Sequence, residues 1–238
     1  MSPLNTHNYH NIVVLTGAGV SAGSGLSTFR GPDGKWKNEL LEASDGRRVM
    51  ELLPKMWEGY SKARQALPNF EPNEAHYALA RWQQEWGSSR SITLLTQNVD
   101  GLHQKAGSTE VSELHGSLTE TRCTNPDCPS EPFTDTKGYD HVPVCPVCGS
   151  PLRPNIVLFH EPLPVQHLQR AKNALREADL FISIGTSGIV APASNFVVAA
   201  KQVGARTIYV NLAPLHTDSP FDEEIIGAAE EVLSSWLD

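Results

Sequence analysis

Residues 11–25 read NIVVLTGAGVSAGSG, an apolar run followed at once by a glycine-rich turn. The run Asn11–Leu15 is typical of a buried strand. The turn Gly17–Ala22 fits a loosened G-x-G-x-x-G/A pattern, in which small residues let backbone N–H groups approach a pyrophosphate at a helix N-terminus. The pattern alone does not separate a dinucleotide site from a plain glycine-rich turn, because Glu39, a candidate for the acidic ribose ligand, follows no clear strand.

The bulk composition limits the class of protein. The chain has 238 residues, of which 39% are hydrophobic and 19% charged, enough for a substantial core in one large lobe with a small one. Its 27 acidic against 19 basic residues give a net charge of −8, which disfavours non-specific nucleic-acid binding. We expect no signal peptide, because the first residues lack a basic segment followed by an apolar run, and no uninterrupted apolar run reaches about 18 residues. We therefore expect a cytoplasmic protein with no membrane span and no direct nucleic-acid binding.

Apolar segments alternate with amphipathic ones through the rest of the chain. Buried strands are expected within 91–102, 180–188 and 206–210. Helices are expected, from apolar residues at helical spacing, at 54–67, 74–86, 165–179, 192–204 and 223–237. Asn73 can cap the second of these helices. Strands that alternate with helices favour a parallel sheet with right-handed crossovers.

The four cysteines all lie between positions 123 and 148, as the pairs Cys123/Cys128 and Cys145/Cys148. A disulfide framework would scatter them, and a cytoplasmic chain would not keep it oxidised. Two knuckles that face each other make the tetrahedral all-sulfur site that Zn2+ prefers, while two incidental cysteine pairs are the alternative. Because four thiolates fill such a site, we expect one structural Zn2+ with no position open for water or substrate.

The predicted fold class is therefore α/β: a doubly wound (Rossmann-like) parallel sheet with an inserted small four-cysteine zinc ribbon and a helical module. We expect the Rossmann-like domain at 1–120 and 154–238, with the helical module at about 37–87 within it. The zinc-ribbon subdomain is expected at 121–153, where it interrupts the alternation of strands and helices.

Small or polar residues stand at the carboxyl ends of four predicted strands. They are Gly17 with Ser21, Gln97 with Asn98 and Asp100, Gly185 with Thr186 and Ser187, and Asn211. Ligands of doubly wound sheets bind in the crevice outside these strand ends, so a nucleotide-sized polar crevice is expected. His115 follows the second of these strands after a short intervening segment. A zinc site with four cysteine ligands does not require a histidine ligand. We expect His115 at the same rim, with a buried core histidine or a surface histidine as the alternative.

In order and spacing, these motifs resemble the sirtuins, the NAD-dependent protein lysine deacylases. The matching segments are GAGVSAGSGLSTFRGPDGKW (17–36), TQNVDGLH (96–103), ELHGSL (113–118), the two cysteine pairs, GTSGIVAPA (185–193) and VNLAP (210–214). The match covers roughly residues 12–236. Tyr60 and GTSGIVAPA look most like the bacterial class III branch, which removes acetyl and in some members succinyl or malonyl groups.

The resemblance implies NAD-dependent removal of acyl groups from protein lysines, with nicotinamide and O-acyl-ADP-ribose as products. His115 is then the catalytic base, since a neutral imidazole can take a proton from a ribose hydroxyl at neutral pH, and Asn98 acts with it in the nicotinamide pocket. The implied cofactor-binding residues are Gly17, Ala18, Gly19, Ser21, Ala22, Phe29, Arg30, Trp36, Gln97, Asn98, Val99, Asp100, Gly185, Thr186, Ser187, Asn211, Leu212, Ala213 and Ala229.

The resemblance also implies how the expected partner, an acylated lysine of a protein, is bound. A substrate peptide would add as a strand between Val157–Glu161 and Gly188–Val190, with Val157, Phe159 and His160 as substrate residues. His160 stands where most members have glycine, and a side chain that simply faces solvent is the alternative.

Acyl choice depends on a second departure from the family pattern. Members that prefer acidic acyl groups carry a Tyr-x-x-Arg pair, which binds the distal carboxylate. Here Arg64 follows Tyr60 one position late, a rotation of about 100° on a helix. Removal of acetyl groups is expected, and removal of succinyl or malonyl groups stays open.

Two competing interpretations remain at this level. Mono-ADP-ribosyl transfer would use the same NAD site, and an intact His115 favours deacylation over it. A non-catalytic zinc-ribbon interaction protein would leave the polar strand ends without a role, and the acidic charge argues against one that binds DNA.

Overall fold

The computed structural model describes residues 4, 8–28, 44–85, 90–188, 191, 193–215 and 218–236. Phe29, Arg30 and Trp36, three of the expected cofactor-binding residues, lie outside these described residues. So do residues 189–190 of the second expected peptide-binding segment and part of the expected helical module. Within the described ranges, no helix has both the length and the apolar content needed to cross a bilayer.

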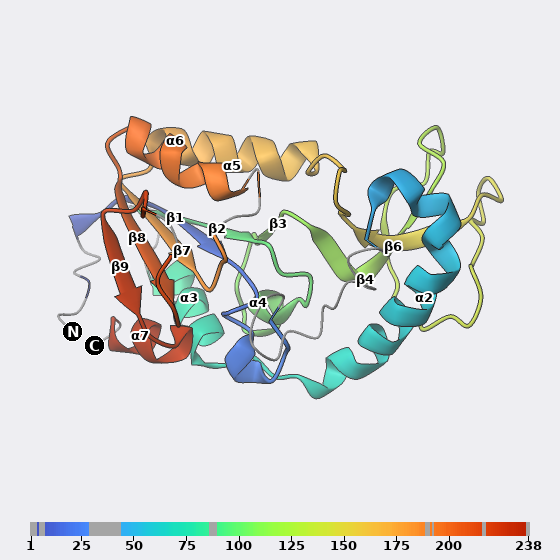
Figure 1. The fold of residues 1–238 in the computed structure, drawn as a ribbon, viewed down its shortest axis with the longest axis horizontal. Helices are drawn as coiled ribbons and strands as arrows, with labels where there is room; N and C mark the ends of the chain where they lie inside the picture. Colours follow the sequence, from blue (N-terminus) through green and yellow to red (C-terminus); the bar gives the residue numbers. More distant parts are fainter. Residues whose placement is uncertain are drawn as a thin grey trace.

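The centre of the fold is a six-stranded sheet with the order β3-β2-β1-β7-β8-β9 (Figure 1). Its strands are β1 (Asn11–Thr16), β2 (Ser91–Thr96), β3 (Ser112–Glu113), β7 (Leu180–Ile184), β8 (Arg206–Asn211) and β9 (Glu223–Ile226). All neighbouring strands pair in parallel. The order reverses between β1 and β7, which is the switch point of a doubly wound sheet. The predicted fold class is confirmed.

Side chains of β1 point alternately to the two faces of the sheet, and helices cover both faces. Ile12 and Val14 belong to a core cluster with α3 (Glu74–Glu85) and α7 (Ala229–Ser235). Val13 and Leu15 belong to a second cluster with α5 (Val165–Glu177) and α6 (Phe196–Gln202). Figure 1 shows α5 and α6 along one side of the sheet and α3 and α7 along the other. Burial on both faces explains the continuous apolar run of the strand.

The predicted helix at 223–237 is wrong in its first part. Residues 223–226 form β9, which pairs in parallel with β8, and α7 begins only at Ala229. Ile225 packs against the core while Ile226 is exposed. One side of this edge strand pairs with β8, a partner that local helical spacing does not reveal.

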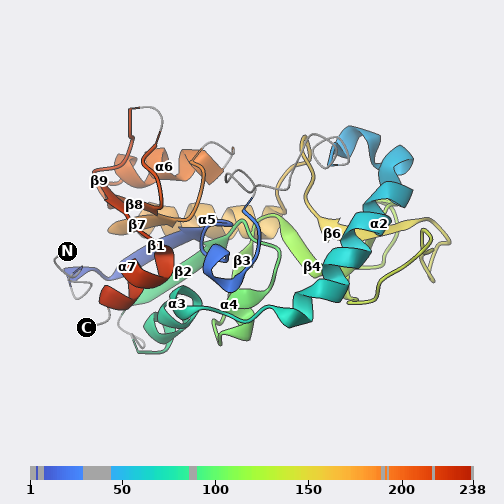
Figure 2. The ribbon, with the colours of Figure 1, turned by 60° about the horizontal axis from the view of Figure 1, so that its bottom comes forward.

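A second, antiparallel sheet has the order β5-β4-β6. Its strands are β4 (Gly116–Cys123), β5 (Phe133–Thr134) and β6 (Leu152–Ile156). Figures 1 and 2 both show the helix α2 (Val49–Ala66) beside β4 and β6, away from the parallel sheet. Because β4 and β6 run across residues 120 and 153, the small sheet extends beyond the expected ribbon, and the predicted domain boundaries stay a prediction.

The remaining helical segments follow the sequence closely, with one exception. Asn73 caps α3 as predicted, since its Oδ1 accepts a hydrogen bond from the Ala75 N–H at 3.0 Å. Helix α2, by contrast, begins at Val49 rather than at Pro54, which lies inside it. Proline removes one intrahelical hydrogen bond, and Met50, the residue four positions earlier, lies exposed at the surface. The short segments are α4 (Leu102–Lys105) and the 3-10 turns η2 (Ala22–Ser24), η3 (Gly46–Arg48), η4 (Leu67–Asn69) and η6 (Ala193–Asn195).

Candidate functional site

The turn after β1 and the turn after β7 pack directly against each other at the switch point. Gly17 donates its N–H to the carbonyl oxygen of Ile184 at 3.0 Å, and Gly19 donates to that of Gly185 at 2.9 Å. A Cβ atom on Gly19 would lie 2.6 Å from the Cα of Gly185, a distance that real side chains do not adopt. The glycines are therefore required by the close approach of two turns, which leaves bare backbone at the crevice.

Ser21 joins the first two strand ends. Its buried Oγ donates to Oδ2 of Asp100 at 2.7 Å and accepts from Nδ2 of Asn98 at 3.1 Å. Asn98 also donates to the carbonyl oxygen of Gly17 at 3.1 Å. The burial of Asp100 raises the pKa of its carboxyl group, although hydrogen bonds from Leu102 and Ser21 favour the ionised form. Ser21, Asn98 and Asp100, predicted separately, form one cluster.

His115 lies between β3 and β4, at the rim beside β2. Its Nδ1 is 3.0 Å from the carbonyl oxygen of Gln97. A carbonyl oxygen only accepts, so Nδ1 carries the proton and Nε2 is left as an acceptor. Burial lowers the pKa of His115, and the bond to Gln97 opposes this only in part. The ring is therefore a neutral base at pH 7.

Two buried histidines close to this cluster had no assigned role in the sequence analysis. His76 has its Nε2 3.4 Å from Oγ of Ser21, and its ring centroid is 4.9 Å from that of His103. Nε2 of His103 lies 2.8 Å from Oγ1 of Thr16. Burial lowers the pKa of His76 to about 4 and that of His103 to about 3, so both are neutral. Two features of the sequence could have pointed to these histidines: His103 ends the segment TQNVDGLH, and His76 lies on an otherwise apolar helix face.

The ends of β7 and β8 meet at Thr186. Nδ2 of Asn211 and the hydroxyl of Tyr209 both donate to its carbonyl oxygen, at 2.8 and 2.7 Å. Ser187 is half-buried beside it. Leu212 and Ala213 are exposed just beyond the strand, as a ligand contact requires. Ala229 differs from them, because its side chain belongs to the core cluster under the sheet.

An acidic cavity of about 430 Å3 opens next to this cluster and shares Asp100 with it. Glu113, Ser117, Glu120 and Arg64 also line it. Burial, together with the nearby charges of Glu120 and Asp100, raises the pKa of Glu113 to about 7. The cavity lies beside β3, the strand that precedes His115, and between α4 and the small sheet.

The four cysteines come together as predicted. Their sulfur atoms all lie within 4.8 Å of one another. Sγ of Cys123 is 3.5 Å from that of Cys148, and Sγ of Cys128 is 3.8 Å from that of Cys145. Four thiols in one compact group fit a single Zn2+ in the tetrahedral geometry that this ion prefers. His115 is not part of the group, so the metal and the imidazole have separate roles.

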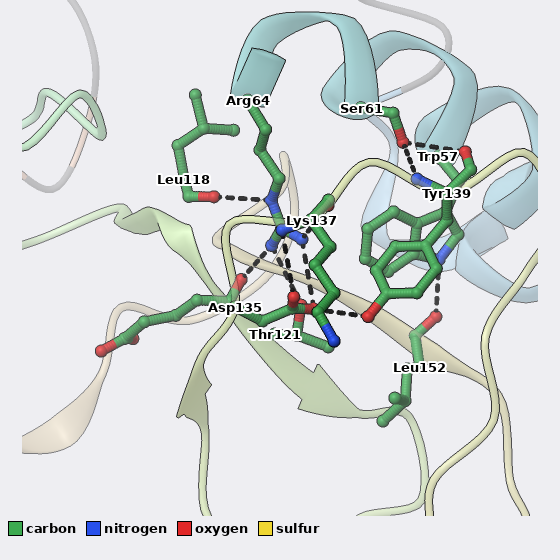
Figure 3. A network of polar contacts seen from close by, with 10 residues as sticks. Trp57, Ser61, Arg64, Leu118, Thr121, Asp135, Lys137, Tyr139 and Leu152 are labelled. Carbon is green, nitrogen blue, oxygen red and sulfur yellow. Dashed lines mark hydrogen bonds and ion pairs between the residues drawn. The ribbon is translucent and has the colours of Figure 1, made fainter. Parts of the chain in front are cut away.

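The substrate role predicted for Arg64 does not fit the structure. Its side chain is 1% exposed, and Figure 3 shows it turned inward between α2 and the small sheet. All of its guanidinium nitrogens already donate, to the carbonyl oxygens of Leu118, Lys137 and Glu120 and to the side chains of Thr121 and Asp135. A guanidinium has only five N–H groups, so none is left for an acyl carboxylate.

The other expected substrate residues lie at or near one edge of the small sheet. Phe159 is 38% exposed, although its N–H and carbonyl oxygen pair with Ser44 and Gly46. His160 is exposed with a φ of 70°, a backbone conformation in which glycine is favoured over histidine. Val157 is half-buried, and its N–H donates to the carbonyl oxygen of His115. Burial raises the pKa of Tyr60 to about 12, so its hydroxyl stays neutral.

The comparisons with known proteins agree with one another. A family model described as the Sir2 family matches residues 17–192. An NAD-dependent protein deacylase of Aquifex aeolicus (strain VF5) is 45% identical over 203 residues, which are 84% of this chain and 83% of that protein. A solved Sir2 homolog–NAD complex is 37% identical with a TM-score of 0.85, covering 96% of this chain and 88% of that one. A solved complex of a Sir2 homologue mutant with ADP ribose is 37% identical with a TM-score of 0.87, covering 96% and 91%.

Proposed function

The chain belongs to the Sir2 family, and from that premise we propose that it is an NAD-dependent protein deacylase. It removes acyl groups, acetyl first of all, from lysine side chains of proteins and releases nicotinamide and O-acyl-ADP-ribose. The observation that carries the proposal is the hydrogen bond from His115 to Gln97, which leaves a neutral imidazole with an unprotonated Nε2 at the rim of the sheet. Ser21, Asn98 and Asp100 form a buried polar cluster at the same rim.

The residues at the strand ends fit an NAD molecule. The glycine turns offer bare backbone at the switch point, where doubly wound sheets bind dinucleotides. We assign the phosphates to Gly17–Ser21 and Thr186–Ser187, and the adenosine end to 211–213. Nicotinamide is assigned to Asn98 and Asp100, whose amide and carboxylate groups can pair with a carboxamide.

The reaction needs a base at the ribose. Bound NAD would supply a ribose carbon that accepts the acyl oxygen and a nicotinamide leaving group. Nε2 of His115 would then take the proton of a ribose hydroxyl, because Nδ1–H is held by Gln97. The ribose oxygen freed of its proton can bond to the acyl carbon, and one water would balance the release of the lysine amine and O-acyl-ADP-ribose. The lowered pKa of His115 keeps this nitrogen free of a proton at neutral pH.

The acylated peptide is proposed to add as an extra strand at Val157–Glu161. The exposed side chains of Phe159 and His160 support this edge as the contact surface. Zn2+ would hold the ribbon together and take no part in the reaction, since four thiolates fill its coordination sphere. The absence of direct nucleic-acid binding also belongs to the proposal and is supported by the net charge of −8. A cytoplasmic location belongs to the proposal as well.

Acetyl is the acyl group that this chain favours. Binding of a succinyl or malonyl carboxylate would need an uncompensated cation near Tyr60. All N–H groups of Arg64 already donate to other partners. Arg153 is held by an ion pair with Glu161 at 2.5 Å, a carboxylate that Arg122 shares at 3.4 Å. The neutral hydroxyl of Tyr60 adds no positive charge. We therefore propose a preference for uncharged acyl groups.

Incubation of the zinc-loaded protein with NAD and an acetyl-lysine peptide tests the proposal. Free lysine and nicotinamide should appear in equal amounts. A zinc-loaded, folded protein that releases neither product contradicts it. Transfer of ADP-ribose to protein without lysine release favours the competing mono-ADP-ribosyl transfer instead.

A further inference from the structure

Strand β4, which links the four-cysteine segment to His115, contains a break in its pairing. It pairs with β6 at Gly116 and again from Thr121 onward, with a shift of register between these two points. The residues between them therefore leave the ladder between β4 and β6. Buried backbone groups that lose their ladder partners need other partners, and irregularities of this kind often occur next to active sites, where they redirect a strand.

Arg64 supplies those partners from helix α2. Its Nε donates to the carbonyl oxygen of Leu118 at 2.8 Å, and its Nη2 donates to that of Glu120 at 2.6 Å. A guanidinium holds its donors in one rigid plane, so it can fix two carbonyl groups at a set separation, which the single ammonium of lysine cannot do. Arg64 thus holds two carbonyl groups of the irregular stretch, whose other supports are the pairing with β5 at Glu120 and the N–H of Asp135 at Thr119.

Asp135, from the four-cysteine segment, holds Arg64 in place. Its Oδ2 is 3.4 Å from Nη1 of Arg64 and accepts a hydrogen bond from Thr121 Oγ1 at 2.7 Å (Figure 3). The Arg64 and Asp135 side chains are only 1% and 5% exposed, so removal of either partner would leave a buried charge without compensation. The pair is stiffened further by Tyr139, whose hydroxyl donates to Asp135, and by the Trp57 ring 5.1 Å from the guanidinium.

The other side of the same stretch touches the candidate active site. Leu118 donates its N–H to the carbonyl oxygen of Val99 at 2.9 Å. Val99 lies between Asn98 and Asp100, the two residues that bond to Ser21. Leu118 is therefore held by Arg64 through its carbonyl group and by the Asn98–Asp100 loop through its N–H. This gives a continuous path of hydrogen bonds from Asp135 to the polar cluster.

We propose that Arg64, anchored by Asp135, is a positioning residue that sets the path of β4 and thereby the placement of His115 and of the Asn98–Asp100 loop. It touches neither cofactor nor substrate in this proposal. Its effect on turnover rests on the proposed deacylase function, whereas its effect on the backbone of β4 does not. The two can therefore be tested in the same samples with separate readouts.

The test compares Arg64→Lys with the double variant Arg64→Met/Asp135→Asn, which removes the ion pair without leaving an unpaired buried charge. Lys62→Met is the matched control, because Lys62 lies on the same helix in an exposed pair with Glu58. Three properties are measured on the full chain. They are the zinc content, the amide hydrogen exchange of peptides covering 97–100, 115–121 and 180–184, and the separate kcat and KM values for NAD.

Both Arg64 variants should keep one zinc ion per chain and exchange faster at 97–100 and 115–121, with no change at 180–184. Their kcat should fall about tenfold or more, with KM for NAD changed by less than about threefold, because a displaced reacting group costs rate more than affinity. Lys62→Met should match the wild type throughout. Unchanged exchange at 115–121 overturns the proposal. Exchange that is faster at 180–184 to the same degree also overturns it, because Arg64 would then stabilise the fold as a whole and not β4 in particular. A wild type without turnover contradicts the deacylase function alone, and the exchange data still decide the positioning role.

Discussion

Nδ1 of His115 lies 3.0 Å from the carbonyl oxygen of Gln97. Gln97 follows β2 directly, and His115 follows the neighbouring strand β3, so this hydrogen bond joins two adjacent strand ends of the parallel sheet. The bond fixes the tautomer and leaves Nε2 as the basic nitrogen. The ring is neither in the four-cysteine group nor among the residues of the hydrophobic core clusters. Several measurable consequences depend on this placement.

Replacement of His115 by alanine should remove the base without disturbing the fold. We expect kcat to fall by about 10²–10⁴, the usual contribution of a general base, with zinc content and Tm close to wild type. His141→Ala is a suitable control, because His141 is an exposed histidine that contacts Asp140 and the ring of Tyr139, away from the strand ends. A His115→Ala enzyme within about twofold of the wild-type rate would show that another group takes the proton.

The pH dependence of kcat/KM should report the lowered pKa of His115. The neutral ring is the active form, and burial moves its pKa below the ordinary value of 6.5. As the pH falls, the active form therefore persists to lower pH than it would for an exposed histidine. The profile should be flat between about pH 8 and 6.5 and fall only below that range. An acid limb with its midpoint above about pH 7 disagrees with a buried neutral base.

Acyl selectivity should change when an arginine is placed three residues after Tyr60, which is the spacing of the Tyr-x-x-Arg pair. The wild type should deacetylate at least about tenfold faster, in kcat/KM, than it removes succinyl or malonyl groups, because Arg64 has no N–H group left for an acyl carboxylate. Ala63 is exposed on α2 and lies on the same helix face as Tyr60. Ala63→Arg should therefore raise kcat/KM for succinyl-lysine peptides. Unchanged selectivity in a folded Ala63→Arg protein would place acyl recognition elsewhere, and Lys62→Arg is the control for added guanidinium on the exposed face.

Zinc should be required for the folded structure and should take no direct part in the reaction. Removal of the ion by a chelator should lower Tm and abolish turnover, since the four thiols hold the segment that carries Asp135 and Tyr139. Reconstitution with Co2+ should restore the zinc-enzyme rate within about twofold, because a filled tetrahedral site offers no position to substrate. A turnover rate or pH profile that depends strongly on the identity of the metal would indicate a catalytic ion.

Much of the fold could be predicted because its signals are local. The buried strands at β1, β2, β7 and β8 are short apolar runs that end in glycine or polar residues, and burial on both faces of a parallel sheet produces that pattern. The cysteine spacing likewise reveals a metal site without any knowledge of the rest. The edge strand β9 could not be predicted in this way, because its partner β8 is chosen by tertiary packing while Glu223–Ile226 also fits helical spacing.

The candidate site was predicted unevenly for a related reason. Strand topology brings the ends of β1, β2 and β7 together, so Ser21, Asn98 and Asp100 could be placed from the sequence. The role of Arg64 could not, because the carbonyl groups that it binds lie in an irregular stretch of β4 that no residue pattern marks. His76 was missed because a buried histidine on an apolar helix face has the same pattern as a core residue.

The most direct test follows the acyl group itself. The zinc-loaded protein is incubated with NAD and a peptide whose lysine carries a deuterated acetyl group, and the products are identified by mass spectrometry. Transfer to ADP-ribose predicts deuterated acetyl-ADP-ribose in an amount equal to the free lysine and the nicotinamide released. Deuterated acetate with NAD left intact would mean simple hydrolysis, and it would contradict the central claim that the acyl oxygen is captured by the ribose beside His115.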